Sequence, residues 1–309
     1  MPLVPRAVRS LLSACALASL ALAFPLHAQN DFSKVKVRAV AAGPGVAMLL
    51  GAGGNIGVSA GEDGVFLVDD QYAGLTGKIR AAVDSIGGGK PIRFVLNTHW
   101  HGDHVGGNAD LAGTGAVIVA HDNVRRRMSV PQFIAAFGET VQASPAAALP
   151  IVTFDDTVTF HLNGDDIEAF HVPPAHTDGD VMVRFRRANV LHMGDVFFNG
   201  LYPFIDVSSG GSIAGMIRAC DRVLPLLGPD TKVIPGHGPL GDRAALQAFR
   251  DMLAKVRDRV ARLVREKKTL EQVRAAKPTA DLDEVWGRGF LKPDDFVGIV
   301  YADLARPAR

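Results

Sequence analysis

Three histidines and one aspartate are crowded into the six residues from His99 to His104, within the stretch NTHWHGDHVGGN. The chain has 10 histidines in 309 residues, so this density is far above an even distribution. The cluster directly follows Ile92–Leu96, a short apolar segment typical of a buried strand. Imidazole and carboxylate groups gathered in this way are typical of a metal site. Such a site also needs ligands from elsewhere, so the fold has to bring distant loops to the end of this strand.

Three later loops offer the missing ligands, and each one also follows a predicted strand. His176 lies in PPAHTDGD, Asp195 in MGD and His237 in PGHGP. Loops at one end of a scaffold of strands are where catalytic groups usually sit. Glycines flank nearly all of these residues, and glycine lets a backbone turn sharply and approach an ion closely.

The spacing within the first cluster predicts which of its side chains can bind the same metal ion. In an extended segment, His99 and His101 point to the same side and can bind one cation. Asp103 and His104 follow a turn at Gly102 and can face a second position. Imidazole and carboxylate without thiolate suit zinc, with iron or manganese as alternatives. Three histidines on one ion leave a position for water, and two adjacent ions can share a nucleophilic hydroxide.

The rest of the chain alternates strands and helices without a visible repeat, which predicts two similar αβ halves packed into one domain. Strands are expected at residues Val35–Val40, Val46–Leu50, Ile56–Ala60, Val65–Asp70, Ile92–Leu96, Ala116–Val119, Val158–His161, Ile167–Val172, Val181–Phe185, Val190–His192 and Lys232–Ile234. Helices are expected at Thr76–Ile86, Ser212–Leu227 and Arg243–Lys268, with shorter ones to the end. The basic segment Ala254–Lys268 carries an apolar stripe, so we interpret it as a core-packed helix with a solvated charged face rather than a lipid- or partner-binding surface.

The motif THWHGDH resembles the HxHxDH signature of the metallo-β-lactamase superfamily, and the later loops follow in that family's order, from about Val46 to Leu240. The resemblance implies a four-layer αβ/βα sandwich, an α/β fold of a single domain, with the site at the edge between its two sheets. It implies a metal centre of two zinc ions and a catalytic role for Asp103. By resemblance, the first metal would bind His99, His101 and His176, and the second Asp103, His104 and His237, with Asp195 bridging.

Other polar residues near these loops are candidates for supporting or substrate-contacting roles. Thr177 is expected to orient His176, and Asp178 or Asp180 to support a ligand imidazole through its other nitrogen. His192 lies in the strand leading to Asp195. Pocket-lining candidates are Asn199 and Tyr202, Trp100 is expected to pack under the loop, and His121, His161 and His171 are interpreted as structural.

Residue 195 separates the substrate classes of this superfamily best. The segment GDVFFN has an aspartate and no nearby lysine, which resembles the glyoxalase-II ligand set and not the cysteine or serine of zinc β-lactamases. The loop HTDGD, however, resembles the HTPDN loop of β-lactamases. The leading hypothesis is a hydrolase that uses a metal-bound hydroxide to open an amide- or ester-type carbonyl bond, with a β-lactam or lactone as the first substrate class. The alternatives are phosphodiester or sulfate-ester hydrolysis, or an accessory metalloprotein of a periplasmic redox system with little turnover.

Residues 1–28 have the order of a secretory signal peptide: two arginines, an apolar run from Leu11 to Leu26, and a small residue at Ala28. The run is short for a membrane span, so an uncleaved anchor is the lesser alternative. We therefore expect a mature domain at residues 29–309, with its C-terminal helices from about residue 243. This mature protein is expected to be periplasmic or secreted. After cleavage Cys220 alone remains, so no internal disulfide forms. A formal net charge of +1 argues against nucleic acid as the main partner. The partner expected from the hydrolase hypothesis is a small-molecule substrate.

Overall fold

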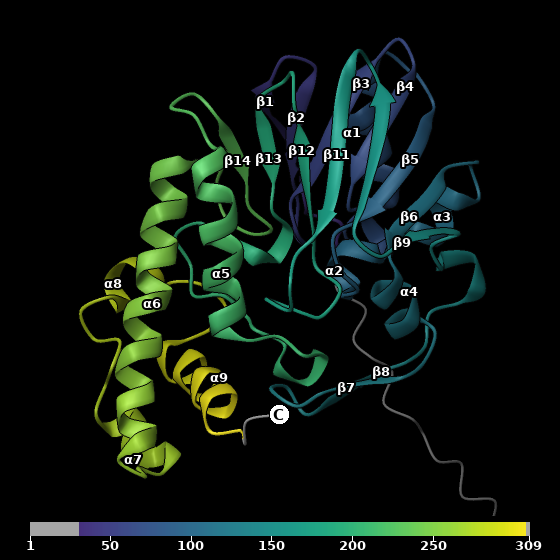
Figure 1. Ribbon diagram of the computed structural model, residues 1–309. Coiled ribbons are helices and arrows are strands. Elements are labelled where there is room, and N and C mark those ends of the chain that lie inside the picture. The colour runs from purple at the N-terminus through teal and green to yellow at the C-terminus, as the bar shows by residue number, and fades with distance from the viewer. Residues whose placement is uncertain (1–30, 307–309) are drawn as a thin grey trace, which may run out of the picture.

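The computed structural model describes residues 31–306, so the expected signal peptide lies outside the described residues. Two β-sheets face each other, and helices cover both outer surfaces (Figure 1). The predicted four-layer αβ/βα sandwich is confirmed by this arrangement. No helix between residues 31 and 306 has the length and apolar content needed to span a bilayer.

The first sheet has seven strands in the order β1-β2-β3-β4-β5-β6-β9. It is antiparallel from β1 to β4 and parallel from β4 to β9. Parallel neighbours need crossover connections, which here contain helices. The strands are β1 (Arg38–Gly43), β2 (Val46–Leu50), β3 (Ile56–Gly61), β4 (Gly64–Val68), β5 (Ile92–Asn97), β6 (Val117–His121) and β9 (Val152–Phe154). The crossover helices are α1 (Thr76–Gly87), α2 (Gly102–Val105), α3 (Asn108–Ala112) and α4 (Asp122–Met128).

The second sheet has six strands in the order β10-β11-β12-β13-β14-β15. Only β13 and β14 in it are parallel, and the helix α5 (Ile213–Val223) lies in their connection. The strands are β10 (Thr157–Leu162), β11 (Asp165–His171), β12 (Val181–Phe185), β13 (Val190–His192), β14 (Lys232–Ile234) and β15 (Gly241–Asp242). The loops that carry the predicted ligands follow strands of both sheets. These loops lie at one edge of the sandwich, where α2 also lies (Figure 1).

The apolar strands of the first sheet are buried on both faces. In β4, Phe66 and Val68 pack against Phe185 of the second sheet, whereas Val65 and Leu67 pack in the layer under α1. Because side chains of a strand alternate between faces, a continuous apolar run is what a strand between two packed layers requires.

A second helical layer covers the other sheet. It consists of α5, α6 (Arg243–Arg265), α7 (Leu270–Ala275), α8 (Asp283–Trp286) and α9 (Pro293–Leu304). Val256, Val260 and Leu263 of α6 are buried in the same core cluster as α5 and α9. The apolar stripe of the basic segment therefore faces the core, as predicted. Cys220 of α5 is fully buried, and burial raises the pKa of its thiol far above the usual range.

Some element boundaries differ from the prediction. The first strand begins at Arg38 and not at Val35, and β4 ends at Val68 and not at Asp70. Asp69 and Gln71 have φ angles of 65° and 59°, and this left-handed backbone cannot continue a strand. A two-stranded hairpin, β7 (Gln132–Ile134) and β8 (Glu139–Val141), was not predicted. Its strands have three residues each, too few to show a periodic pattern.

Candidate metal centre

Asp69, at the end of β4, holds the HxHxDH loop in place. The backbone N–H and the hydroxyl of Thr98 both donate to this carboxylate at 2.7 Å. The Nδ1 of His104 lies 2.8 Å from the same carboxylate. Since a carboxylate accepts, Nδ1 of His104 carries a hydrogen and its Nε2 faces inward, toward Asp103 and Asp195.

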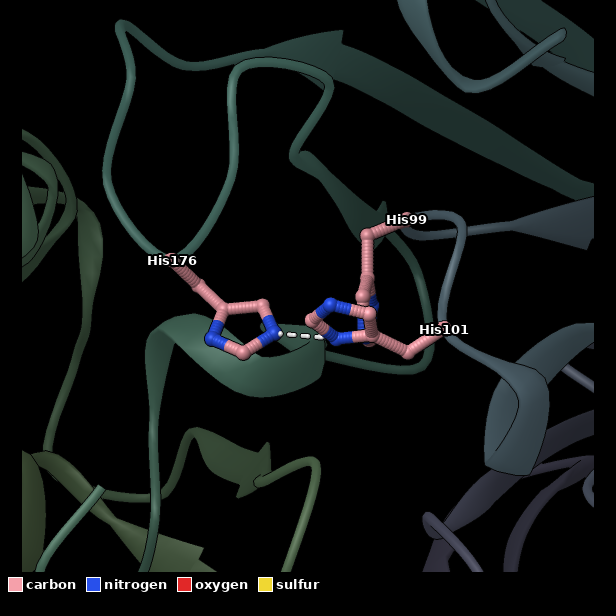
Figure 2. A group of neighbouring side chains, drawn as sticks. All are labelled: His99, His101 and His176. Atoms are coloured by element: carbon pink, nitrogen blue, oxygen red, sulfur yellow. Dashed lines mark hydrogen bonds between the residues drawn. The ribbon is translucent and has the colours of Figure 1, made fainter. Parts of the chain in front are cut away.

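His99, His101 and His176 form the first cluster, in which their ligand atoms all lie within 4.8 Å of one another (Figure 2). The Nδ1 of His176 donates to the Phe204 carbonyl at 2.8 Å, and Nε2 of His101 donates to the Asp206 carboxylate at 3.0 Å. In the neutral rings, the nitrogens without hydrogen therefore face each other, and they are only 2.9 Å apart. Two lone pairs at this distance repel unless a cation lies beside them.

Asp103, His104 and His237 form a second cluster of possible ligands. Asp103 Oδ2 lies 3.3 Å from Nε2 of His237 and 3.6 Å from Nε2 of His104. Asp195 lies between the clusters: its oxygens are 3.1 Å from His104 and 3.5 Å from His237, and 3.6 Å from His176 on the other side. All seven predicted ligands thus converge from loops that follow four strands.

Burial and carboxylates divide the histidines into two kinds. Burial lowers the pKa of His99 well below its usual range and that of His176 to about 4, so both rings are neutral at pH 7. Burial also opposes the charged form of His104 and His237, but the neighbouring carboxylates outweigh it. They raise the pKa of His104 well above its usual value and that of His237 to about 9. In the metal-free protein, protons on His104 and His237 therefore balance the same carboxylate charges that a bound cation would balance.

The residues present fit a divalent cation. Three buried ligand atoms, His99 Nε2, His104 Nε2 and Asp195 Oδ1, make no hydrogen bond of good geometry in the described part of the chain, although the last two lie 3.1 Å apart. Buried polar atoms normally have partners, so these atoms point to an ion. Glycines leave the space: a Cβ at Gly54 would lie 2.0 Å from the His104 ring, and one at Gly236 would lie 1.9 Å from Asp195 Oδ1.

Two of the predicted supporting residues, Thr177 and Asp180, contact each other in the loop that carries His176. The hydroxyl of Thr177 and the backbone N–H groups of His176 and Thr177 donate to the Asp180 carboxylate. Asp180 therefore shapes the loop and not the imidazole itself, which is held by Phe204. Asp178 points away and pairs with Arg127 at 2.7 Å.

The remaining candidates do not touch the ligand side chains. His192 is buried and hydrogen-bonds the Asn55 carbonyl at 3.1 Å, while its other nitrogen accepts from Gly194. Asn199 donates its side-chain amide to the Pro239 carbonyl at 2.9 Å, so it anchors the loop after His237. Tyr202 is buried and donates to Asp283 at 2.8 Å, away from the metal ligands. His121, His171 and His161 lie outside the clusters described above: the first two rings stack at 3.9 Å, and His161 is exposed beside Asp166.

A cavity of about 510 Å³ opens onto Asp103, Asp195 and His237. Trp100 forms part of its wall, and its indole N–H donates to the Ser209 hydroxyl at 3.2 Å. Other aromatic and aliphatic residues of the wall are Tyr72, Ile134, Phe137, Val141, Phe198, Phe204 and Phe290.

The sequence did not predict a role for the hairpin residues, for Phe290, or for the carboxylates of Asp69 and Asp206. A signal for Asp69 was present, because an acidic pair ending an apolar strand is an unfavourable place for carboxylates without a role.

A sequence model of the metallo-beta-lactamase superfamily matches residues 50–257, about two thirds of the chain. This chain belongs to the metallo-β-lactamase superfamily. It is 30% identical over 151 residues to a hydroxyacylglutathione hydrolase of Polaromonas sp., covering 48% of this chain and 49% of that protein. A second hydroxyacylglutathione hydrolase, from Methylococcus capsulatus, is 30% identical over 183 residues, covering 56% of this chain and 61% of its own. The chain thus spans about half the length of the curated relatives it matches.

The solved structures similar to this chain support the same fold. A metallo-beta-lactamase from Pontibacter korlensis superposes with a TM-score of 0.58 at 19% identity, covering 72% of this chain and 99% of that one. Superfamily membership and the clustered histidines and carboxylates together indicate a metal-binding site.

Proposed function

We propose that this superfamily member is an exported hydrolase with two zinc ions that opens an ester- or amide-type carbonyl bond of a small molecule. The observation that carries the proposal is the pair of facing nitrogens of His101 and His176, 2.9 Å apart, together with the inward Nε2 atoms of His99 and His104 that have no hydrogen-bond partner among the described residues. Supporting hydrogen bonds fix these rings from outside. Rings oriented in this way are suited to ligate metal once the ligating nitrogen carries no proton.

The assigned ligands are the two clusters described above, with Asp195 between them. When bound, divalent zinc would supply an activated water and polarise the substrate carbonyl. Hydrolysis adds water to the carbonyl carbon and breaks its bond to the leaving oxygen, nitrogen or sulfur, which takes up one proton. Asp103 lines the cavity and is suited to orient the attacking water as a hydrogen-bond acceptor, because its pKa is held near 2 and the carboxylate stays ionised: burial opposes this, but His104 and His237 outweigh it.

Tyr72 is placed to donate a hydrogen bond to a substrate oxygen. Its ring lines the cavity, and burial together with the charges of Asp103 and Asp195 raises its pKa to about 12. The hydroxyl therefore stays protonated through neutral and alkaline pH. A neutral donor in a site with acidic residues suits a carbonyl oxygen better than a carboxylate.

The cavity wall supports an uncharged carbonyl substrate over a glutathione thioester. A glutathione thioester presents two carboxylates, whereas no lysine or arginine is among the described residues that line this cavity. Glu139 adds negative charge to the wall. A lactone or a simple ester, which carries no carboxylate, therefore fits the wall better than the substrate named for the hydroxyacylglutathione hydrolase relatives, and a β-lactam brings one carboxylate where glutathione brings two.

The test begins with metal content after zinc reconstitution, followed by turnover of nitrocefin, γ-lactones, thioesters, nitrophenyl esters, bis-nitrophenyl phosphate and nitrophenyl sulfate. Two zinc ions per chain with lactone, ester or β-lactam turnover supports the proposal. Less than one zinc ion per chain, or turnover confined to the phosphate or sulfate, refutes it, and full metal loading without turnover favours the redox-accessory alternative. Export is tested separately by locating the full-length chain in fractionated bacterial cells, where a cytoplasmic pool alone would contradict it.

A further inference from the structure

A second cavity of about 520 Å³ adjoins the first, and Phe137 and Phe290 line both. Both rings are largely exposed, at 46% and 60%, so the two cavities meet at side chains with room to rotate. Phe204 and Ile205 are consecutive in the chain but line different cavities, the first and the second respectively. Each volume alone is within the roughly 300–1,000 Å³ of small-molecule sites.

The second cavity is built from three separate segments that are tied together. The turn of the β7–β8 hairpin donates from Ala135 N–H to the Ser208 hydroxyl at 3.0 Å. Arg306, after α9, donates to the Val207 carbonyl at 3.0 Å. The segment carrying Ile205 and Val207 thus connects the hairpin to the end of α9, and the cavity lies among them. These contacts make its walls part of the packed structure.

The wall of the second cavity is mainly apolar. Its members include Ile205, Val207, Leu270, Leu291 and Ile299, and Arg274 is the one cation among the described lining residues. The guanidinium of Arg274 already donates to the Asp294 carbonyl at 3.1 Å. A ligand part that fits here is a hydrocarbon chain, because such a wall offers contact area and few free polar partners.

We propose that the second cavity binds an apolar tail of the substrate while the carbonyl group lies at the metal centre. This inference rests on the proposed function and narrows it to esters, thioesters or lactones with a long alkyl or acyl chain. The chain passes the rings of Phe137 and Phe290 from the first cavity into the second. Val141 of the hairpin, 37% exposed, adds a further apolar side chain to the wall of the first cavity.

The test uses a series of nitrophenyl esters from acetate to decanoate with the zinc-loaded protein. Burial of each further methylene group should raise kcat/KM by up to about fourfold until the cavity is full. Ala302 on α9 and Ala136 in the hairpin turn are exposed residues of the cavity wall, so tryptophan there fills the space without disturbing the core. Ala302→Trp and Ala136→Trp should each remove the dependence on chain length and leave acetate turnover unchanged. Ala81→Trp, on an exposed position of α1, is the matched control and should behave as wild type.

A binding measurement without metal separates this inference from the proposed function. Calorimetric titration of the metal-free protein with hexanol and decanol should show tighter binding of decanol and a negative heat-capacity change. The Ala302→Trp variant should bind decanol at least tenfold more weakly. Equal decanol affinity in wild type and both filled variants would overturn the tail site, even if ester hydrolysis is observed. Absence of any lactone, ester or β-lactam turnover with normal decanol binding would instead refute the proposed function alone.

Discussion

The glycine at position 54 gives the sharpest test of how the second cluster is built. In Gly54→Ala the new Cβ would lie 2.0 Å from Cε1 and 2.3 Å from Nε2 of His104. Carbon atoms in contact normally lie about 3.5–4.0 Å apart, so the ring has to move by about 1.5 Å. His104 is fully buried and its other nitrogen is held by Asp69 at 2.8 Å, so this movement also strains that hydrogen bond. We expect zinc affinity to fall by about 10–100-fold, or about 1.4–2.7 kcal/mol, as for loss of a supporting ligand contact.

The assay is competition for zinc with a chromophoric chelator, combined with thermal unfolding of the metal-free protein. Overpacking of this kind costs about 1–3 kcal/mol of unfolding free energy, so the melting temperature of Gly54→Ala should also fall. Gly102→Ala is the matched control. Gly102 lies in the loop that carries His104, but a Cβ at this position has nothing within 4 Å. Unchanged zinc affinity in Gly54→Ala would refute the reasoning. An equal loss in Gly102→Ala would show that the overlap with His104 is not the cause.

Three further changes test the other parts of the site. Asp206→Asn removes the carboxylate that lies 3.0 Å from Nε2 of His101 and fixes the hydrogen on that nitrogen. Zinc affinity should therefore fall by about 10–100-fold while the circular dichroism spectrum stays unchanged. Normal zinc affinity would contradict the assigned orientation of the His101 ring. Asp103→Ala should reduce turnover of an active ester at least about 100-fold while the protein stays folded, and retained turnover would remove Asp103 from the reaction. Burial lowers the pKa of His192 to about 4, against about 6.5 in an unfolded chain, so its stabilising effect is present above pH 6.5 and is lost as the pH falls toward 4. The stability difference between the metal-free wild type and His192→Gln should therefore shrink by about 2–3 kcal/mol from pH 7.5 to 4.5 in urea unfolding, and a constant difference would show that His192 takes up its proton equally in both states.

The sequence predicted the layers and most strands because the apolar runs of this fold are buried on both faces. Strands such as Val46–Leu50 and Val181–Phe185 have the predicted bounds, since a glycine, proline or charged residue marks each end. The hairpin at residues 132–141 was not predictable in this way. Its strands are short and exposed, and its position depends on a distant hydroxyl, that of Ser208.

The same limit applies to the candidate site. The convergence of the seven candidate ligands followed from motif order, but their orientation depends on Asp69, Asp206 and the Phe204 carbonyl. A backbone carbonyl carries no sequence signal, and Asp206 lies 105 positions from its histidine partner. Thr177, Asp180 and His192 were noticed because they flank the motifs, yet their contacts could only be assigned in three dimensions. The cavity at the candidate site is lined in part by Phe137 and Phe290, which lie far from every motif in the sequence.

The raised pKa values of His104 and His237 have a consequence for how the protein acquires its metal. At neutral pH the metal-free second cluster is already close to charge balance, because protons on these two rings offset the carboxylates of Asp103 and Asp195. A cation can enter only as those protons leave, so loading is an exchange and not a simple addition. Uptake would acidify an unbuffered solution, and acid would compete with the metal for the nitrogens of His104 and His237. The local pH of the compartment, as much as its zinc concentration, would then set the fraction of active enzyme.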